Sequence, residues 1–576
     1  MEALRRLARF GAGAGLLFLA CGRGPQGATR THYDLLLRNG WVVDGTGNPR
    51  FQGDVAVQGN RIAAVGFLPA AVASETLDVR GLVVAPGFID MLGQSETALM
   101  IDGRVLSKVS QGITTEVTGE GGSIAPLTDA LVALDSDFMK KYQIAESWRD
   151  LDGYFANYGR GHEAATINLA TFVGATQVRM AVIGFENRRA TPAEQAHMEA
   201  LVDSMMLQGA LGVSTALMYA PANYAPIEEL IGLAKAARRH GGIYASHIRN
   251  EAAHEDAALD EAFRIGREAD IPVEIWHLKA AGKPQWGRLP HVLARIDSAR
   301  AAGLDVTADQ YPYTAAATSL DASIPQWAHA GGTDSLIARL KNPAMRARLR
   351  QEILTGAGEE NPWTNSGGAG GVLIAGVFQD SLRALDGRYL QEIAAARHRD
   401  PIETMFDIVI ADHARTGAIY FEMSEDDVQA GLKTAWVGVD CDASGAAPDG
   451  PLSKDYTHPR AYGSFPRILG HYVRDLHLMP LEFAIRKMTS LPAQRVGLKD
   501  RGLLRAGMAA DITVFDPRTI SDRATYERPH QLSVGIEYVL VNGQIVINRG
   551  QLTAARPGVG LLGPGYVPLE LRTYAR

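Results

Sequence analysis

Short apolar segments recur through the middle of the chain, and helix-like segments separate them. A strand of a parallel sheet is covered on both faces, so it is apolar throughout rather than alternating. Turn residues bound each of these segments, as expected for buried strands. Eight segments have this character: residues 83–92, 113–118, 166–173, 211–217, 243–248, 272–278, 304–308 and 435–439. Eight is the strand count of a (β/α)8 barrel, so the pattern predicts an α/β fold with a TIM-like barrel rather than a doubly wound sheet.

Two of the intervening helices are especially clear. The sequence TPAE at residues 191–194 is a capping box with proline in the first turn, which marks a helix start. Apolar residues then follow at helical spacing, namely Met198, Leu201, Val202, Met205 and Met206. We interpret these methionines as core filling rather than as part of a cofactor site. A second helix is predicted over residues 226–240, and it ends at a glycine pair that leads into the strand ending at His247.

The regions on either side of the predicted barrel have a different sequence pattern. Residues 33–79 and 502–562 alternate short β-type runs with Gly and Asn turns. Neither region could bury one face of a sheet alone, so we predict that both chain ends form one small β-sandwich. Residues 319–422 are too long for a barrel connection, which predicts an insertion that covers the carboxyl ends of the strands as a lid.

These patterns divide the chain into consecutive parts. We expect a lipoprotein-type signal peptide at 1–21, a tether at 22–32, the N-terminal part of the sandwich at 33–82, the barrel at 83–318, the insertion at 319–422, the last barrel strand and helix at 423–500, and the C-terminal part of the sandwich at 501–576.

Composition excludes several classes of protein. The chain has 576 residues, of which 46% are hydrophobic and 21% charged, so it is neither disordered nor a coiled coil. The formal net charge of -7 with mixed signs argues against nucleic-acid binding. Two cysteines, Cys21 and Cys441, cannot build a disulfide framework or a zinc ribbon. The body contains no run of about 20 apolar residues, which argues against a polytopic membrane protein.

The first residues indicate the cellular location. Arg5, Arg6 and Arg9 form a basic region, and the apolar stretch at 10–20 is too short to span a bilayer, as in an export signal. The sequence FLAC that ends at Cys21 resembles a bacterial lipobox, in which the cysteine is lipidated after cleavage. We therefore expect an exported protein, either periplasmic or anchored to a membrane through Cys21. The alternative is an ordinary secretory signal with Cys21 inside its apolar stretch.

Candidate reactive groups lie where the predicted strands end. Glu120 follows the second strand, His247 the fifth and His277 the sixth, while Asp440 and Asp442 follow the eighth. In a barrel these ends meet at one face, which is where catalytic groups cluster. Two imidazoles and one carboxylate form a plausible set of three zinc ligands with the fourth position left for water. A lone histidine at such a position is more often structural. Since side chains alternate along a strand, Asp440 and Asp442 point the same way.

Several motifs resemble known families. The sequence APGFID at 85–90 and AADITVFDP at 509–517 resemble motifs of the amidohydrolase superfamily. Further stretches resemble the N-acyl-D-amino-acid deacylases, or D-aminoacylases: GIYASHIRNE at 242–251, HLK at 277–279, DQYPY at 309–313, HPRAYGSFPR at 458–467 and ARPG at 555–558. The resemblance runs from about Tyr33 to Arg576, and several ordered motifs make chance agreement very improbable.

The resemblance implies roles for individual residues. His247 and His277 would bind the tightly held zinc, and Asp442 would be the catalytic acid/base. Asp440, which points the same way on the strand, is the alternative acid/base. Further residues would bind the substrate: Lys279 and Tyr311 at its carboxylate, with Arg249 and Arg460 as helpers. Each of these also has a structural interpretation, with Tyr311 as a loop anchor beside Pro312 and the arginines in surface ion pairs.

Two departures from the family pattern affect the metal site. The family usually has His-x-His after Phe-Ile-Asp, whereas this chain has Leu92-Gly93-Gln94, so we expect one zinc ion and no second site. The family usually carries a metal-ligating Cys after the second strand. Here Glu120 takes that place if one residue is deleted, and its carboxylate is a harder zinc ligand than thiolate. In the alternative, Glu120 does not coordinate and the metal is weakly bound or absent.

The expected function is that of a zinc-dependent amidohydrolase acting on the linear amide of an N-acyl-D-amino acid or a similar carboxylated amide. Asp442 would accept a proton from the attacking water and pass it to the leaving nitrogen. Two alternatives remain, namely an amidohydrolase for another amide, cyclic imide or dipeptide, and a metal-free, lipid-anchored binding protein. The expected partner is a small carboxylated amide, and the sequence gives no indication of oligomeric state.

Overall fold

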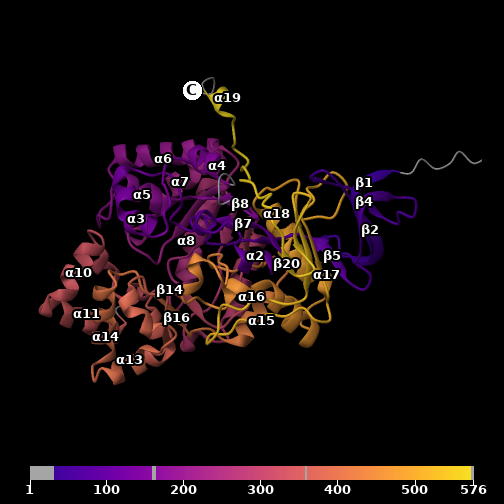
Figure 1. Cartoon of the computed structure of the whole chain (residues 1–576). Coiled ribbons are helices and arrows are strands. Elements are labelled where there is room, and N and C mark those ends of the chain that lie inside the picture. Colours follow the sequence, from indigo (N-terminus) through magenta and orange to yellow (C-terminus); the bar gives the residue numbers. More distant parts are fainter. Residues whose placement is uncertain (1–30, 159–163, 357–359, 573–576) are drawn as a thin grey trace, which may run out of the picture.

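The computed structural model describes residues 31–158, 164–356 and 360–572. The expected signal peptide with Cys21, and the tether up to residue 30, lie outside the described residues. Within the described part of the chain, no helix combines the length and apolarity needed to cross a membrane. Figure 1 shows a central barrel region, a β-rich region next to the N-terminal strands, and a lobe of helices that includes α10, α11, α13 and α14.

Two parallel sheets make the barrel. The first contains β6 (Phe88–Asp90), β7 (Ile113–Thr118) and β8 (Asn168–Thr171), and the second contains β9 (Val173–Gly174), β10 (Gly212–Ala216), β11 (Ile243–His247), β12 (Val273–Ile275) and β13 (Val306–Ala308). The sheets are continuous because the amide of Leu211 donates to the carbonyl of Thr171.

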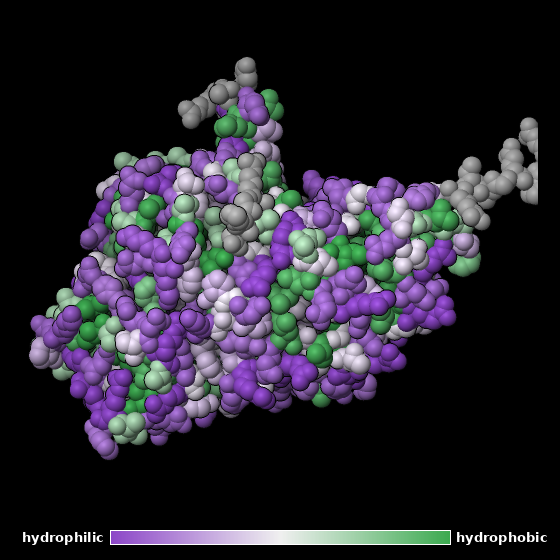
Figure 2. Space-filling model, in the orientation of Figure 1, coloured by the Kyte–Doolittle hydropathy of each residue, from purple (hydrophilic) through white to green (hydrophobic). Residues whose placement is uncertain are grey.

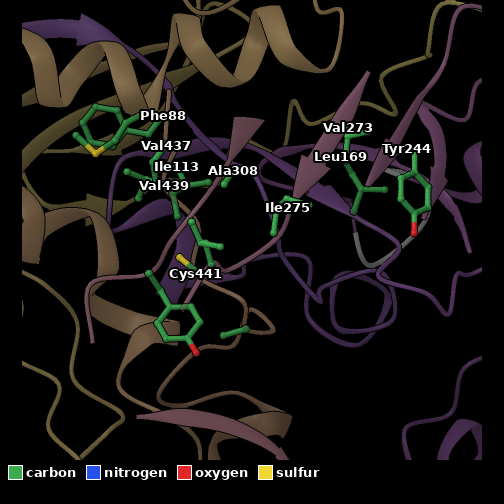
Figure 3. Close-up of a cluster of buried hydrophobic side chains, with 14 of the residues drawn as sticks. Phe88, Ile113, Leu169, Tyr244, Val273, Ile275, Ala308, Val437, Val439 and Cys441 are labelled. Atoms are coloured by element: carbon green, nitrogen blue, oxygen red, sulfur yellow. The ribbon is translucent and has the colours of Figure 1, made fainter. Parts of the chain in front are cut away.

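The eighth predicted segment closes the barrel without forming a full strand. Val437 makes a parallel bridge to Ala308 at the end of β13, and Ala443 makes another to Gly93 beyond β6. Buried side chains from the strands pack together around this closure, including Phe88, Ile113, Val437, Val439 and Cys441 (Figure 3). The predicted (β/α)8 barrel is therefore confirmed.

The first predicted segment, residues 83–92, is two strands rather than one. β5 (Val83–Pro86) pairs antiparallel with β17 (Ile512–Phe515) in the flanking sheet, and only β6 enters the barrel. Gly87 lies between them, where an added Cβ would be 2.2 Å from Oγ1 of Thr114. A glycine is needed at this close approach because any side chain would collide with β7.

Both chain ends contribute to the flanking sheet. Its strands are β1 (His32–Val42), β2 (Phe51–Gln58), β3 (Arg61–Gly66), β4 (Val72–Asp78), β5, β17, β18 (Ile536–Val541), β19 (Gln544–Asn548) and β20 (Gln551–Leu552). An antiparallel backbone bridge joins Arg61, at the start of β3, to Ala509, just before β17, so the sheet curls back on itself. The enclosed core includes Leu35, Leu37, Val55, Val57, Ile512, Val514 and Leu540. This arrangement confirms the sandwich expected from two chain ends.

Helices cover the outside of the barrel. The capping box is present, since Oγ1 of Thr191 accepts from the amide of Glu194 and the Glu194 carboxylate accepts from the amide of Thr191. This box begins α6 (Pro192–Leu207), whose residues Met198, Val202, Met205 and Met206 are buried. The other helices outside the insertion are α1 (Ala98–Ile101), α2 (Leu106–Val109), α3 (Asp129–Lys141), α4 (Leu151–Asn157), α5 (Ala175–Val182), α7 (Ile227–Arg239), α8 (Glu255–Ala269), α9 (Leu289–Ala301), α15 (Glu425–Lys433), α16 (Arg460–Arg467), α17 (Leu481–Met488), α18 (Ser490–Arg495) and α19 (Leu569–Arg572).

The insertion between β13 and the closing segment has its own core. Its antiparallel sheet has the order β14 (Ala316–Ser319), β16 (Gly417–Tyr420) and β15 (Val372–Ala375). The helices around it are α10 (Thr333–Lys341), α11 (Pro343–Thr355), α12 (Pro362–Asn365), α13 (Leu390–Ala396) and α14 (Pro401–Ala411). Their apolar side chains form a cluster of the insertion's own residues, and hydrophilic residues cover much of the visible outer face of this lobe (Figure 2).

A buried ion cluster joins the first barrel strand to the closing segment. Nζ of Lys108 lies 2.7 Å from Asp90 and 3.2 Å from Glu116, and all three side chains are inaccessible to solvent. Burial lowers the pKa of Lys108, but the two carboxylates outweigh it and raise that pKa. Asp90 also accepts a hydrogen bond from the amide of Cys441, at 2.8 Å. The ammonium thus stabilises the carboxylate that holds the closing segment against β6.

Replacing Lys108 with alanine should lower the free energy of unfolding by about 3–5 kcal/mol, because two buried carboxylates would lose their cation. Urea denaturation followed by tryptophan fluorescence measures the change. A matched control is Arg264→Ala, which removes the exposed ion pair between Arg264 and Glu268 and should cost less than about 1 kcal/mol. Equal costs for the two variants would show that the buried cluster is not a major source of stability.

Candidate metal and substrate site

The structure brings together Glu120, His247 and His277, the three predicted metal ligands. Oε1 of Glu120 lies 2.9 Å from Nδ1 of His247 and 3.1 Å from Nε2 of His277. The candidate ligand atoms all lie within 4.8 Å of one another. Burial raises the pKa of Glu120, but hydrogen bonds from both histidines outweigh it and hold that pKa well below its usual range. Two nitrogens and one carboxylate oxygen that converge in this way fit a zinc ion with an open fourth position.

Backbone strain accompanies two of the site residues. His277 has φ +38° and Asp442 has φ +42°, both in the left-handed region that residues other than glycine rarely adopt. Such conformations cost about 1–3 kcal/mol each and persist where surrounding contacts enforce them. The amide of His277 donates to Oδ1 of Asp309 at 2.6 Å, and the amide of Asp442 donates to the carbonyl of Leu92 at 2.8 Å. These hydrogen bonds fix the two side chains at the mouth of the barrel.

A carboxylate lies behind the two histidines, and the sequence analysis did not identify it. Oε1 of Glu251 is 3.0 Å from Nδ1 of His277, and Oε2 is 3.7 Å from Nε2 of His247. Nζ of Lys279 donates to both oxygens of Glu251, at 2.7 and 2.8 Å, and lies 2.8 Å from Nδ1 of His277. Burial raises the pKa of Glu251, but the charges of Lys279 and of both histidines outweigh it and lower that pKa. The spacing of four residues between His247 and Glu251 was the available signal.

Asp442 lies in the cavity with the predicted metal ligands, whereas Asp440 is not among the residues that line it. Asp442 lines the cavity, and its Oδ2 lies 2.9 Å from Nη1 of Arg460. Nε2 of Gln94 donates to Oε2 of Glu120 at 2.7 Å and to Oδ1 of Asp442 at 3.4 Å. Asp440 is fully buried, and burial raises its pKa to about 7. The positive φ of Asp442 interrupts the strand alternation that made the two aspartates equivalent in the sequence.

The predicted substrate-binding residues are placed differently from one another. Lys279, Tyr311 and Arg460 line the cavity, and the guanidinium carbon of Arg460 lies 4.5 Å from the centroid of the Tyr311 ring. Arg249 instead forms an ion pair with Glu261 at 2.8 Å and donates to the carbonyl of Asn223. These contacts hold the Arg249 side chain against α8 and the segment that precedes α7, apart from the residues that line the cavity.

The cavity has a volume of about 390 Å³ and lies between the barrel mouth and the insertion. The insertion contributes Thr318, Glu360, Tyr420 and Glu422 to its wall. Burial, reinforced by the charge of Glu251, raises the pKa of Glu360 to about 8. Burial and neighbouring Glu360 raise the pKa of Glu422 well above its usual range. Burial and the charge of Arg460 lower the pKa of His458, another wall residue, so its ring is neutral at pH 7.

Known proteins share both the sequence and this architecture. A family model described as the amidohydrolase family matches residues 75–547. D-aminoacylase of Alcaligenes xylosoxydans xylosoxydans is 38% identical over 529 residues, covering 91% of this chain and 97% of the relative. N-acyl-D-glutamate deacylase of the same organism is 36% identical over 531 residues, covering 91% and 96%.

Two solved structures are similar over nearly the whole described fold. One is N-acyl-D-glutamate deacylase from Bordetella bronchiseptica with zinc and a phosphonate inhibitor, with TM-score 0.76, 34% identity, and coverage of 92% of this chain and 100% of that chain. The other is a D-aminoacylase with a binuclear metal centre, described as activated by one metal and attenuated by the second, with TM-score 0.75, 37% identity and the same coverage. The family model and the two curated relatives each cover most of the chain, and they show that this protein belongs to the amidohydrolase family.

Proposed function

We propose that this protein is a zinc-dependent amidohydrolase that cleaves the linear amide of an N-acyl-D-amino acid or a similar carboxylated amide. The observation that carries the proposal is the convergence of Glu120, His247 and His277 beside Asp442 in one cavity. The relatives named for D-aminoacylase and D-glutamate deacylase activity support the same class of substrate.

We propose one zinc ion, held by Glu120, His247 and His277. Zinc in such a site supplies Lewis acidity, which polarises a carbonyl group and makes water more acidic. Leu92 and Gln94 provide no imidazole for a second ion near Glu120. The Gln94 amide instead donates to both Glu120 and Asp442, so a neutral hydrogen-bond donor links these two carboxylates.

Asp442 is the proposed acid/base. Its carboxylate lies in the cavity wall beside Glu120, and its Oδ2 forms an ion pair with Arg460, which leaves Oδ1 toward Gln94. After taking a proton from the attacking water, Asp442 returns it to the nitrogen of the leaving amino acid. Gln94 and the hydrogen bond from the Asp442 amide to Leu92 orient this carboxylate.

We assign the substrate carboxylate to Arg460, with Tyr311 packed against the guanidinium. Arg460 is 3% exposed, and its Nε has no hydrogen-bond acceptor among the described residues. A buried cationic donor of this kind favours an anionic ligand. Lys279 is less available, because its ammonium already contacts both oxygens of Glu251 and Nδ1 of His277. Arg249 is not included in the set, since Glu261 holds it.

The charges in the cavity wall favour a neutral or basic amino-acid side chain over an acidic one. Apart from the two histidines proposed as zinc ligands, the cations at pH 7 among the described wall residues are Lys279, which Glu251 neutralises, and Arg460, which binds the first carboxylate. A second carboxylate would face Glu360 and Glu422 without a cationic partner. The identities to the D-aminoacylase and the D-glutamate deacylase are similar, so the proposal is supported by the number of cations in the wall instead.

We also propose that the chain is exported and anchored to a membrane through a lipid on Cys21. The support is the basic region with Arg5, Arg6 and Arg9, the short apolar stretch after it, and the lipobox-like sequence that ends at Cys21. An anchor of this kind leaves the barrel in the aqueous phase.

Purified protein should contain about one zinc ion per chain, and it should release amine from N-acetyl-D-amino acids faster than from their L isomers. Glu120→Ala should lower both zinc content and turnover, because two histidines alone hold the ion weakly. Metal analysis and an amine assay measure these outcomes. A metal-free protein whose ligand binding is unchanged by Glu120→Ala would not be a hydrolase of this kind. Preference for the L series would exclude the D-amino-acid assignment.

Asp442→Asn should lower kcat by about 10²–10⁴-fold at saturating zinc, because an amide cannot accept the proton of water. Steady-state kinetics and metal analysis together check that turnover falls while zinc remains bound. Asp334→Asn, at a side chain that is 93% exposed, is a matched control and should retain wild-type turnover. Full activity of the Asp442 variant would move the acid/base role to another group, with Asp440 the first to test.

N-acetyl-D-glutamate should have a kcat/KM at least about 100-fold below that of N-acetyl-D-leucine, because burying an unpaired carboxylate costs several kcal/mol. N-acetyl-D-lysine should fall between them or near the leucine compound. A competitive panel of the three substrates gives the ratios. Comparable values for the glutamate and leucine compounds would mean that a second cation reaches the cavity.

A further inference from the structure

The carboxylate of Glu251 lies beside both predicted histidine ligands, on the side of the rings opposite Glu120. His247 directs Nδ1 toward Glu120, while His277 directs Nε2. The opposite ring nitrogens, Nε2 of His247 and Nδ1 of His277, both face Glu251, at 3.7 and 3.0 Å. The two rings have centroids 4.5 Å apart and are nearly perpendicular, at 84°. A single buried group therefore lies within ion-pair distance of two rings that use different nitrogens toward the metal site.

We propose that Glu251 is a positioning residue that holds His247 and His277 in the orientation and tautomer needed to bind zinc. A neutral imidazole that ligates through one nitrogen carries its proton on the other, and a carboxylate that accepts a hydrogen bond from this N–H fixes the ring. Nδ1 of His277 lies 3.0 Å from Glu251 and 2.8 Å from Nζ of Lys279, and because an ammonium cannot accept, Glu251 is the acceptor once Nδ1 carries the proton. For His247, whose Nε2 is buried without a hydrogen-bond partner among the described residues, Glu251 is the nearby acceptor.

Lys279 is the counter-ion of Glu251 and therefore belongs to the same group of interacting residues. Both side chains are almost completely buried, at 3% and 6% exposure, and they make two hydrogen bonds to each other. Without the ammonium, the Glu251 carboxylate would lose two hydrogen bonds and its counter-charge, and its side chain would no longer be held against His277. This role differs from binding the substrate carboxylate, which requires a free donor.

The backbone of Glu251 is also fixed, and from two directions. Its amide donates to the carboxyl of Glu360 in the insertion, and its carbonyl accepts from the amide of Ala281 at 2.7 Å. Glu251 therefore has little freedom to move away when the rings bind a metal. The positions of the two histidine rings therefore depend on residues that are not themselves predicted zinc ligands.

The inference rests on the proposed zinc site, and zinc affinity tests it separately from activity. Glu251→Gln should raise the zinc dissociation constant about 10–100-fold in competition with a chelator, because a neutral amide accepts more weakly. Glu229→Gln is a matched control, since Glu229 is equally buried and binds Arg179 at 2.7 Å outside the site. It should leave the zinc affinity unchanged. If Glu251→Gln does not fold, Glu251→Asp gives the same test with a shortened carboxylate.

A double-variant cycle tests the link to Lys279. Lys279→Gln should also weaken zinc binding, and the variant with both changes should be no weaker than the worse single variant, because the two residues act together. Wild-type protein that fails to bind zinc would overturn the proposed function itself. Wild-type zinc affinity in Glu251→Gln would overturn only the positioning role. If Lys279→Gln instead raised KM with unchanged zinc affinity, Lys279 would act on the substrate.

Discussion

Closure of the barrel by a few residues brings Asp442 to the predicted metal ligands that the other strands carry. The segment that ends at Asp442 is held between β13 and β6 by hydrogen bonds rather than by a long strand, including those from Met91 to Val439 and from Asp442 to Leu92. The Asp90 carboxylate, neutralised by Lys108, holds the amide of Cys441 in the same place. Because Asp442 immediately follows Cys441, the buried ion cluster also fixes the backbone position of the proposed acid/base.

Much of the site could be predicted because the carboxyl ends of all strands in a parallel barrel meet at one face. Glu120, His247 and His277 each follow a recognisable apolar segment, so the carboxyl ends of those segments identified them without knowledge of contacts. The barrel and the sandwich were predictable for a similar reason, since strand count and β texture are local features. The zinc fit of these residues then followed from their chemical types.

Other features depend on contacts that the sequence does not reveal. The distinction between Asp440 and Asp442 depends on one positive φ, and strand periodicity cannot predict where alternation fails. Arg249 was expected at the substrate, but an ion pair with Glu261 holds its side chain against α8. Glu251 was overlooked because its importance comes from Lys279 and His277, which lie on another part of the chain. The division of residues 83–92 into two strands depends on the close approach of Gly87 to Thr114.

The flanking sheet has a consequence for how the chain acquires its structure. β5 pairs with β17, and the hydroxyl of Ser490 donates to the carbonyl of Gly45 across 445 positions of sequence. β1, β2, β3 and β4 pair among themselves, but β5 remains without its partner β17 until most of the polypeptide has been made. Contacts over such separations are slow to form, and unpaired strands are prone to aggregate. The unpaired edge of β5 therefore needs protection during synthesis, and loss of the last strands would remove Ile512, Val514 and Leu540 from the core that the first strands share with them.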